Sequence, residues 1–381
     1  MPLDLDKFSE KVNRLVSQFM ISSTELSVST GISPERIHKL VNARVEPSGD
    51  EVLILADFFK TDYRYFISNE KEAPIEQTDV LFRRHGKDFT KEDRMAVQEV
   101  LYMAENEHFL QCELRRSRLN GDFNYTPVGE FYKGHAEDAA KQLRKHLGYQ
   151  DHVIRINAFE DVRKIGFHVF RRKLSNSGVS GVSIKHPIAG KCILVNYNED
   201  IYRQRFTLVH EAAHGIFDLS ENQDVFVSFE DWERQDLREI RANTFSSNFL
   251  LPKEFILKIR INSWDDKSII EWCNKLSINP EPFSIALKAA GLISEDKQKY
   301  FKTLKIPQSQ KMDSELPASM SENGKRRKLA LLQKGLSDYY VKLCFDACRE
   351  NIISLSRVAE MLLLEENTLY EIMELYGVCF G

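Results

Sequence analysis

The sequence predicts an α+β fold that is mostly helical and has three parts: an N-terminal helix-turn-helix bundle, a core that combines helices with a small β-sheet, and a C-terminal helical module. Three observations carry this prediction. Apolar residues recur every three to four positions in many segments, which is typical of helices. Short apolar runs bounded by turn residues follow one another between about residues 166 and 197, as strands do. A segment rich in Ser, Gln, Lys and Pro at 307–324 reads as a linker before the last helices.

The N-terminal segment is expected to form a run of short helices. An amphipathic helix over residues 8–20 precedes a short helix over 24–30, and Gly31 marks the turn after it. Ser33 and Pro34 then fit the N-cap and first position of a third helix. This order of helix, glycine turn and capped helix predicts a helix-turn-helix module.

The third of these helices would present Arg36 and Lys39 on its exposed face, where they could reach the bases or phosphates of double-stranded DNA, and Arg44 could reach a phosphate. Residues 1–69 nevertheless hold eight basic and ten acidic residues, a net charge of −2. Because much of the affinity for DNA comes from neutralised phosphates, a module for dimerisation or protein contact is the alternative. The candidate DNA-contacting residues are Ser33, Arg36, Lys39 and Arg44.

The most informative motif lies near the middle of the chain. His210, Glu211 and His214 form an H-E-x-x-H pattern within a predicted helix over 202–219, after a predicted strand over 191–197. Helix positions four apart share a face, so both imidazoles can point at one ion with the carboxylate beside them. That is the arrangement of a zinc hydrolase, with two His ligands and a Glu that takes a proton from water. A helix whose histidines are merely hydrogen-bonded is the alternative.

A catalytic zinc site needs a third protein ligand. Glu239 lies in the first turns of a predicted helix that Pro252 ends. Spacing alone makes Glu239 the best of several acidic candidates. The others are Glu230, Asp231, Glu233 and Asp236.

Around these residues the chain resembles the ImmA/IrrE-type metallopeptidases over about residues 130–290. The resemblance rests on Arg205-Phe206-Thr207-Leu208 before the motif, and on Glu239, Asn243 and Leu250-Leu251-Pro252 after it. It implies a zincin-like core in which Glu239 is the third zinc ligand, and a protein substrate such as a partner repressor or antitoxin. It also implies a helix over 135–147, strands over 166–170, 181–184 and 193–196, and a companion helix pair over 266–276 and 280–290. Ser246-Ser247-Asn248 depart from the family, which has small apolar residues there.

The N-terminal segment is similar to the XRE/Cro-type repressor domains. Ser33 and Ile37 match their recognition helix, and Asn42, Arg44 and Pro47-Ser48 match the pattern after it. This resemblance implies binding to a double-stranded DNA operator, and the small, acidic module would bind as a homodimer.

Composition excludes several classes of protein. No apolar stretch reaches the roughly 18–20 residues of a membrane helix, and the acidic N-terminus is unlike a signal peptide. Six scattered cysteines indicate reduced thiols and a cytoplasmic protein. The length of 381 residues suggests two or three domains. We expect segments at 1–68 (helix-turn-helix), 69–125 (helical connector), 126–300 (metallopeptidase), 301–325 (flexible linker) and 326–381 (helical interaction module).

Two functions follow from these patterns. In the first, a zinc-dependent endopeptidase linked to a DNA-binding module cleaves a partner regulator, with zinc held by His210, His214 and Glu239 and with Glu211 as the base. In the second, the chain is a transcriptional regulator whose peptidase-like domain senses or binds and cleaves little. The sequence offers four candidates for the residue that stabilises the oxyanion: His168, His186, Tyr197 and Tyr202.

Overall fold

The structure is a computed structural model, and it confirms an α+β fold that is mostly helical. The chain divides into two compact units, residues 1–103 with 174–177 and residues 104–173 with 178–381, so the boundary falls within one long helix, α7 (Lys91–Glu113). The structure describes residues 3–69, 78, 81–82, 87–116, 123–129, 131–150, 157–175, 178–219, 225–229, 236–261, 263–317 and 319–379, with 226, 228 and 229 described by their backbone alone.

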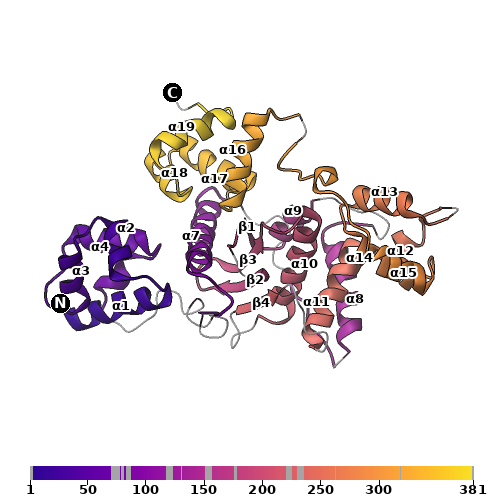
Figure 1. The fold of residues 1–381 in the computed structure, drawn as a ribbon, viewed down its shortest axis with the longest axis horizontal. Helices are drawn as coiled ribbons and strands as arrows, with labels where there is room; N and C mark the ends of the chain where they lie inside the picture. Colours follow the sequence, from indigo (N-terminus) through magenta and orange to yellow (C-terminus); the bar gives the residue numbers. More distant parts are fainter. Residues whose placement is uncertain are drawn as a thin grey trace. The chain divides into compact units, whose positions relative to one another are not determined.

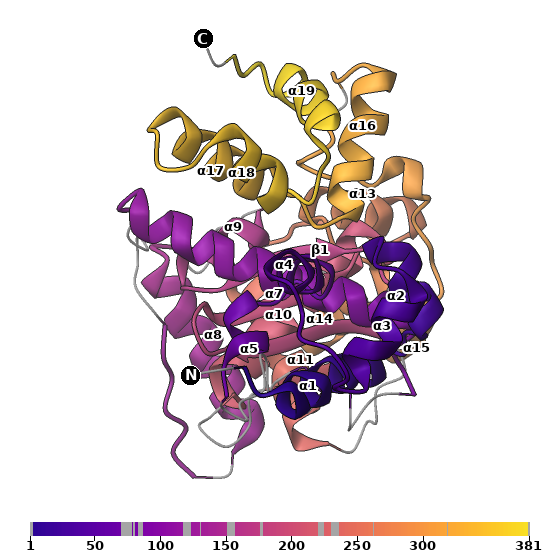
Figure 2. The same ribbon diagram turned by 90° about the vertical axis from the view of Figure 1, so that its left-hand side faces the viewer.

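Short capped helices build the first unit (Figures 1 and 2). Ser22 and Ser48 form capping boxes with Glu25 and Glu51, and Ser33 accepts a hydrogen bond from the backbone N–H of Arg36. Gly31 adopts the left-handed conformation that ends the second helix, as its place in the sequence predicted. The helices before α7 whose bounds the structure describes are α1 (Leu5–Gln18), α2 (Ser23–Thr30), α3 (Pro34–Val41), α4 (Gly49–Phe58) and α5 (Tyr63–Ile67).

A four-stranded sheet with the order β1-β3-β2-β4 lies at the centre of the second unit (Figure 1). β1 runs parallel to β3, and the other two pairs are antiparallel. Three of the strands were predicted, whereas β4 was not. The strands are β1 (His168–Arg172), β2 (Val179–His186), β3 (Gly190–Asn196) and β4 (Val225–Phe229).

The helix with the H-E-x-x-H motif packs on this sheet. α10 (Ile201–Phe217) begins at Asp200, whose side chain accepts hydrogen bonds from the N–H groups of Tyr202 and Arg203. Buried Arg205 donates to the carbonyl groups of Leu276 and Ser277 at the end of α13, which ties the motif helix to the helices that follow it. The neighbouring helices of the core are α8 (Tyr132–His146), α9 (Ala158–Lys164), α11 (Leu237–Leu250), α12 (Lys253–Ile256), α13 (Asp266–Leu276), α14 (Pro280–Ala289) and α15 (Glu295–Phe301).

The segment after α15, predicted as a flexible linker, carries specific contacts with the core. Buried Arg171 of β1 donates to Asp313 at 2.6 Å and to Glu315, and it lies over the rings of Phe159 and Tyr197. The buried charge of Arg171 is stabilised only beside carboxylates, because an unpaired charge in the protein interior is costly. The segment is therefore fixed to the sheet by interactions between residues more than 140 positions apart, which local composition does not reveal.

The C-terminal helices belong to the same compact unit as the sheet, and Figures 1 and 2 show them gathered together. Tyr340 packs against Phe170 of β1, and Tyr339 accepts a hydrogen bond from Gln111 of α7. Lys328 lies within the predicted solvated basic run but is buried, where it contacts Asp338 and Tyr376. These helices are α16 (Glu322–Gln333), α17 (Asp338–Arg349), α18 (Leu355–Met361) and α19 (Glu366–Leu375).

Two further features bear on the expectations from composition. All six cysteines are free. Among the described helices, none has both the length and the apolar character that a membrane crossing requires.

Candidate metal centre

The predicted metal ligands on α10 are brought together by helical spacing. His210 and His214 lie one turn apart, both are fully buried, and their Nε2 atoms are 3.0 Å from each other. Glu211 is fully buried beside them. The helix therefore turns both imidazoles towards one point, as the i, i+4 spacing predicted.

Glu239 completes this group from the first turn of α11, which packs against α10. Its carboxylate oxygens lie 3.2 Å from His210 Nε2 and 3.5 Å from His214 Nε2. Asn243, one turn further along α11, interacts with His210 and acts to raise its pKa. Of the alternative acidic ligands, Asp236 caps α11 by accepting from the N–H of Arg238, and the other three lie outside the described residues.

The three side chains fit a zinc ion. Tetrahedral ligands at zinc–ligand distances of 2.0–2.1 Å are about 3.3 Å apart. The observed separations of 3.0, 3.2 and 3.5 Å bracket that value. Two imidazoles and one carboxylate are also the donors of a catalytic zinc site that leaves one position open. Within the described part of the chain, no other group of three such side chains is close enough to hold a metal ion.

The electrostatics of the three groups are strongly coupled. Burial lowers the pKa of His210 to about 4. Burial alone would also lower the pKa of His214, but its hydrogen bonds to Asp218 and Glu239 and the nearby negative charges raise it to about 9. Burial opposes ionisation of Glu239, yet its contacts with the two histidines lower its pKa to about 2. Glu239 therefore carries the negative charge that a divalent cation requires.

Glu211 is held against strand β2 by two close contacts. The Ser183 hydroxyl lies 2.8 Å from Oε2 of Glu211 and 2.7 Å from its backbone carbonyl oxygen, to which it can donate. Gly181 lies so near that an added Cβ would be 2.7 Å from Cγ and 2.8 Å from Oε1 of Glu211. The strand thus shapes the position of the proposed base, a role that the sequence did not reveal.

A carboxylate that is not one of the three candidate ligands holds the ring of His214. Asp218 accepts a hydrogen bond from Nδ1 of His214 at 2.7 Å, and its other oxygen contacts Arg241 of α11. Neither Asp218 nor Arg241 was predicted as a site residue from the sequence. The signal was present, because Asp218 follows His214 by four positions and so shares its helix face.

The four candidates for oxyanion stabilisation have other partners. His168 Nδ1 is 2.8 Å from Glu107 of α7, and both are buried. His186 Nδ1 accepts from the N–H groups of Ile188 and Ala189 in the β2–β3 turn. The Tyr202 hydroxyl donates to Asn274, and the Arg171 guanidinium lies over the ring of Tyr197 at 5.3 Å from its centroid. Their contacts give no support to any of the four in that role.

In α11, Ser246 and Asn248 stand where the resembling family has small apolar residues, and the helix itself satisfies these polar side chains. Ser246 is fully buried and donates to the carbonyl oxygen of Ala242. Asn248 donates to that of Thr244. These polar side chains return their hydrogen bonds to their own helix and leave the candidate ligand Glu239 in place.

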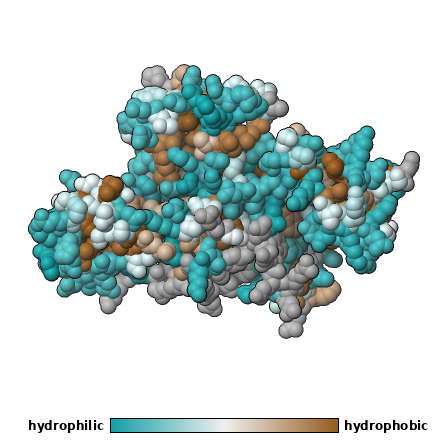
Figure 3. All heavy atoms as spheres, in the orientation of Figure 1, coloured by the Kyte–Doolittle hydropathy of each residue, from teal (hydrophilic) through white to brown (hydrophobic). Residues whose placement is uncertain are grey.

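The predicted DNA-contacting residues differ in their availability. Arg36 was predicted to project freely from α3, but it pairs with Glu51 of α4. It makes two hydrogen bonds to that carboxylate, at 2.6 and 2.8 Å, and one to the carbonyl oxygen of Glu46. Lys39 is exposed and pairs with Glu35 on its own helix at 2.7 Å. Arg44 is exposed. Ser33 caps α3. Figure 3 shows scattered hydrophobic atoms among hydrophilic ones on the visible face of this unit, and Val28 is the most exposed of its large apolar side chains at 80%.

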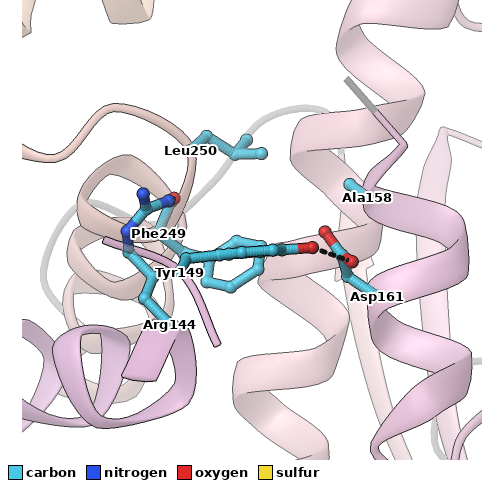
Figure 4. Close-up of a pocket in the computed structure, with 6 residues that line it drawn as sticks. All are labelled: Arg144, Tyr149, Ala158, Asp161, Phe249 and Leu250. Carbon is cyan, nitrogen blue, oxygen red and sulfur yellow. Dashed lines mark hydrogen bonds between the residues drawn. The ribbon is translucent and has the colours of Figure 1, made fainter. Parts of the chain in front are cut away.

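A small pocket elsewhere in the second unit holds none of the metal ligands (Figure 4). The Tyr149 hydroxyl donates to Asp161 across it, and Arg144 donates to the Phe249 carbonyl. The pocket lies between α8, α9 and α11 and is separate from the group formed by His210, His214 and Glu239. Its lining residues are Arg144, Tyr149, Ala158, Asp161, Phe249 and Leu250.

Comparison with known proteins agrees with the geometry of the metal centre. The model of the family Peptidase_M78, the IrrE N-terminal-like domain, matches residues 162–278, less than a third of the chain. The match includes the three ligands and Glu211, and it supports a metallopeptidase-like domain. No curated protein and no solved structure matches the chain. The matched region excludes the N-terminal helices, so their resemblance to repressor domains stays a prediction.

Proposed function

We propose that the second unit is a zinc-dependent endopeptidase. The observation that carries this proposal is the convergence of His210, His214 and Glu239 on one point, with Glu211 buried beside them. A carboxylate from a second helix faces both Nε2 atoms and supplies the third donor that a catalytic zinc site requires. The family match over the same residues supports the same reading.

The residues around the site divide the work of peptide hydrolysis. The chemistry that zinc supplies when bound is Lewis-acid activation of water and of the scissile carbonyl. Glu211 accepts the proton of the attacking water and then delivers it to the leaving amine. Ser183 holds one carboxylate oxygen of Glu211 so that the other can face the water. The two histidines and Glu239 would hold the ion.

The sheet offers a place for an extended protein segment. The outer edge of β1 is occupied, because Arg172 forms a bridge with Lys334 and the Lys173 N–H donates to Gln333. In the described part of the chain, no strand pairs with the outer edge of β4. β4 pairs with β2 at Ser183, the residue that contacts Glu211. An extended substrate added to β4 would therefore run beside the catalytic groups, which favours a protein substrate such as a partner repressor or antitoxin.

The proposal is tested with the purified full chain and its Glu211→Gln variant. Zinc content should be about one ion per chain in both proteins, since the ligands are unchanged. Cleavage of a peptide library, read by mass spectrometry, should be found with the wild type and fall by about 10²–10⁴-fold in the variant, the usual contribution of a general base. Equal cleavage by the two proteins would remove Glu211 from the mechanism.

A second function, a zinc-binding sensor or interaction module with little proteolysis, is favoured by one observation. Glu211 and both histidines are fully buried, and the Glu239 side chain is only 15% exposed. The same experiment separates the two functions. A sensor would bind zinc and give equally low cleavage with and without Glu211, even when tested with the candidate partner regulator.

We also propose that the first unit brings this activity to double-stranded DNA as part of transcription control. The capped α3 after the Gly31 turn supports this role, and the engagement of Arg36 leaves Lys39 and Arg44 as the leading contacts. Changing Lys39 and Arg44 to Ala should abolish sequence-preferring binding to the promoter region of the chain's own gene and leave zinc content unchanged. The matched control changes Lys60, which pairs with Asp57 on the same unit. No sequence preference by the wild type at micromolar protein would favour protein contact.

A further inference from the structure

We infer that Asp218 and Arg241 are positioning residues that fix the ring of His214 and thereby set the affinity of the centre for its metal ion. The inference rests on the proposed zinc site and extends it to two residues that are not ligands. It starts from a chain of contacts that runs from the ligand to α11: His214, Asp218, then Arg241.

The first contact determines which nitrogen of His214 can bind a metal. Asp218 Oδ2 lies 2.7 Å from Nδ1, so the ring donates its proton there. Nε2 is then the nitrogen that is left to bind a metal ion, and it is the atom that faces His210 and Glu239. A carboxylate that accepts from the far nitrogen of a metal-binding imidazole fixes both its tautomer and its rotation, and makes it a stronger donor.

The second contact holds the carboxylate itself. Asp218 sits at the C-cap of α10, where a negative charge is disfavoured by the helix dipole. Arg241 contacts Oδ1, the oxygen that His214 does not use, and both side chains are at least nine-tenths buried. A cation at this position compensates the charge of Asp218 and holds its orientation.

Arg241 is in turn held by its surroundings. Its guanidinium group lies over the rings of Phe217 at 4.5 Å and Tyr132 at 5.0 Å. Arg241 follows Glu239 by two residues in α11. Helix α11 therefore supplies both Glu239, the third ligand, and Arg241, which holds Asp218 against His214. Any shift of α11 would act on Glu239 and His214 together.

The test measures zinc affinity, with Zn²⁺ as the probe, by competition against a chromophoric chelator. We expect Asp218→Asn, which keeps the size of the side chain and removes its charge, to weaken zinc binding roughly 10- to 100-fold, the range found when such supporting groups are changed. Arg241→Ala should weaken it in the same direction. Arg241 acts on His214 only through Asp218. The double variant should therefore have the same zinc affinity as whichever single variant binds zinc less tightly.

Matched variants separate positioning from folding. Arg238→Ala removes an exposed arginine from the same helix, one that pairs with Asp236, and should leave zinc affinity unchanged. Arg241→Lys keeps the charge and should restore part of the affinity. If Arg241→Ala lowers the melting temperature of the metal-free protein so far that it cannot be assayed, Asp218→Asn and Arg241→Lys are compared instead.

The zinc affinities of these variants either support or overturn the role of Asp218 and Arg241 as positioning residues. Wild-type zinc affinity in Asp218→Asn, or additive losses in the double variant, would overturn the inference while leaving the zinc site intact. Failure of the wild type to bind zinc would overturn the proposed function as well. A second readout is the visible spectrum after cobalt substitution: an altered spectrum in Asp218→Asn, with an unaltered one in Arg238→Ala, supports the assignment of Asp218 to the metal centre.

Discussion

The approach of strand β2 to the base gives the sharpest prediction. Gly181→Ala adds one methyl group to the strand, and its carbon would lie 2.7 Å from Cγ of Glu211, 2.8 Å from its Oε1 and 2.9 Å from Cγ2 of Thr207. Ordinary carbon contacts are about 3.5–4.0 Å, so either the strand or the base must move by roughly 1 Å.

That displacement has two measurable costs. Overpacking by a single methyl group destabilises a close-packed core by about 1–3 kcal/mol, which lowers the melting temperature by about 2–4 °C per kcal/mol in a unit of this size. A catalytic group displaced by about 1 Å loses on the order of 10²-fold in rate. Zinc binding should persist, since the atoms nearest to the methyl group belong to Glu211 and Thr207 and to none of the three candidate ligands.

The assay compares Gly181→Ala with Gly178→Ala. Gly178 lies three residues earlier, and an added Cβ there meets no atom within 4 Å. We expect full zinc content in both variants, and lower thermal stability and peptidase activity in Gly181→Ala alone. Wild-type stability together with wild-type activity in Gly181→Ala would refute the packing of Glu211 against β2.

Three further predictions concern stability. Removing zinc with a chelator should lower the melting temperature, because an ion at about 100 times its Kd contributes about 2.7 kcal/mol; the His210→Ala, His214→Ala double variant should not respond. Burial, with the charges of His168 and His108, lowers the pKa of His186 to about 4 from its ordinary 6.5. The unfolded chain therefore binds this proton first, so stability present above pH 6.5 should fall by at most about 3 kcal/mol as the pH drops towards 4; denaturation of His186→Asn should lack this dependence. Arg171→Met should cost about 3–5 kcal/mol in denaturant unfolding, since it leaves Asp313 and Glu315 without their buried cation.

Local patterns predicted much of the metal centre. The facing of His210 and His214 follows from helical periodicity alone, and the Ser33 cap of α3 follows from side-chain chemistry. Glu239 was only the best of several acids by spacing, because the register of α11 against α10 is set by packing between helices. Its placement came from the resemblance to a family and is now given by the structure.

Other features depended on partners distant in sequence. Arg36 looked exposed on its own helix, but Glu51, fifteen residues later, holds it. β4 was missed because a five-residue apolar run is ambiguous until it pairs with another strand. Gly181 gave no sign of its contact with Glu211, since only the packing of β2 on α10 brings them together.

The anchoring of the segment after α15 also limits how this protein can be divided. A fragment that stops at residue 300 would keep Arg171 within the sheet but lose both carboxylates that face it, along with the Tyr340 ring that covers Phe170. The region matched by the family, 162–278, would lose the same support. In evolutionary terms, recombination could not exchange the C-terminal helices for other sequences without the loss of these contacts. A lineage that gained or lost them would also have had to change the neighbouring residues Phe170 and Arg171 of β1.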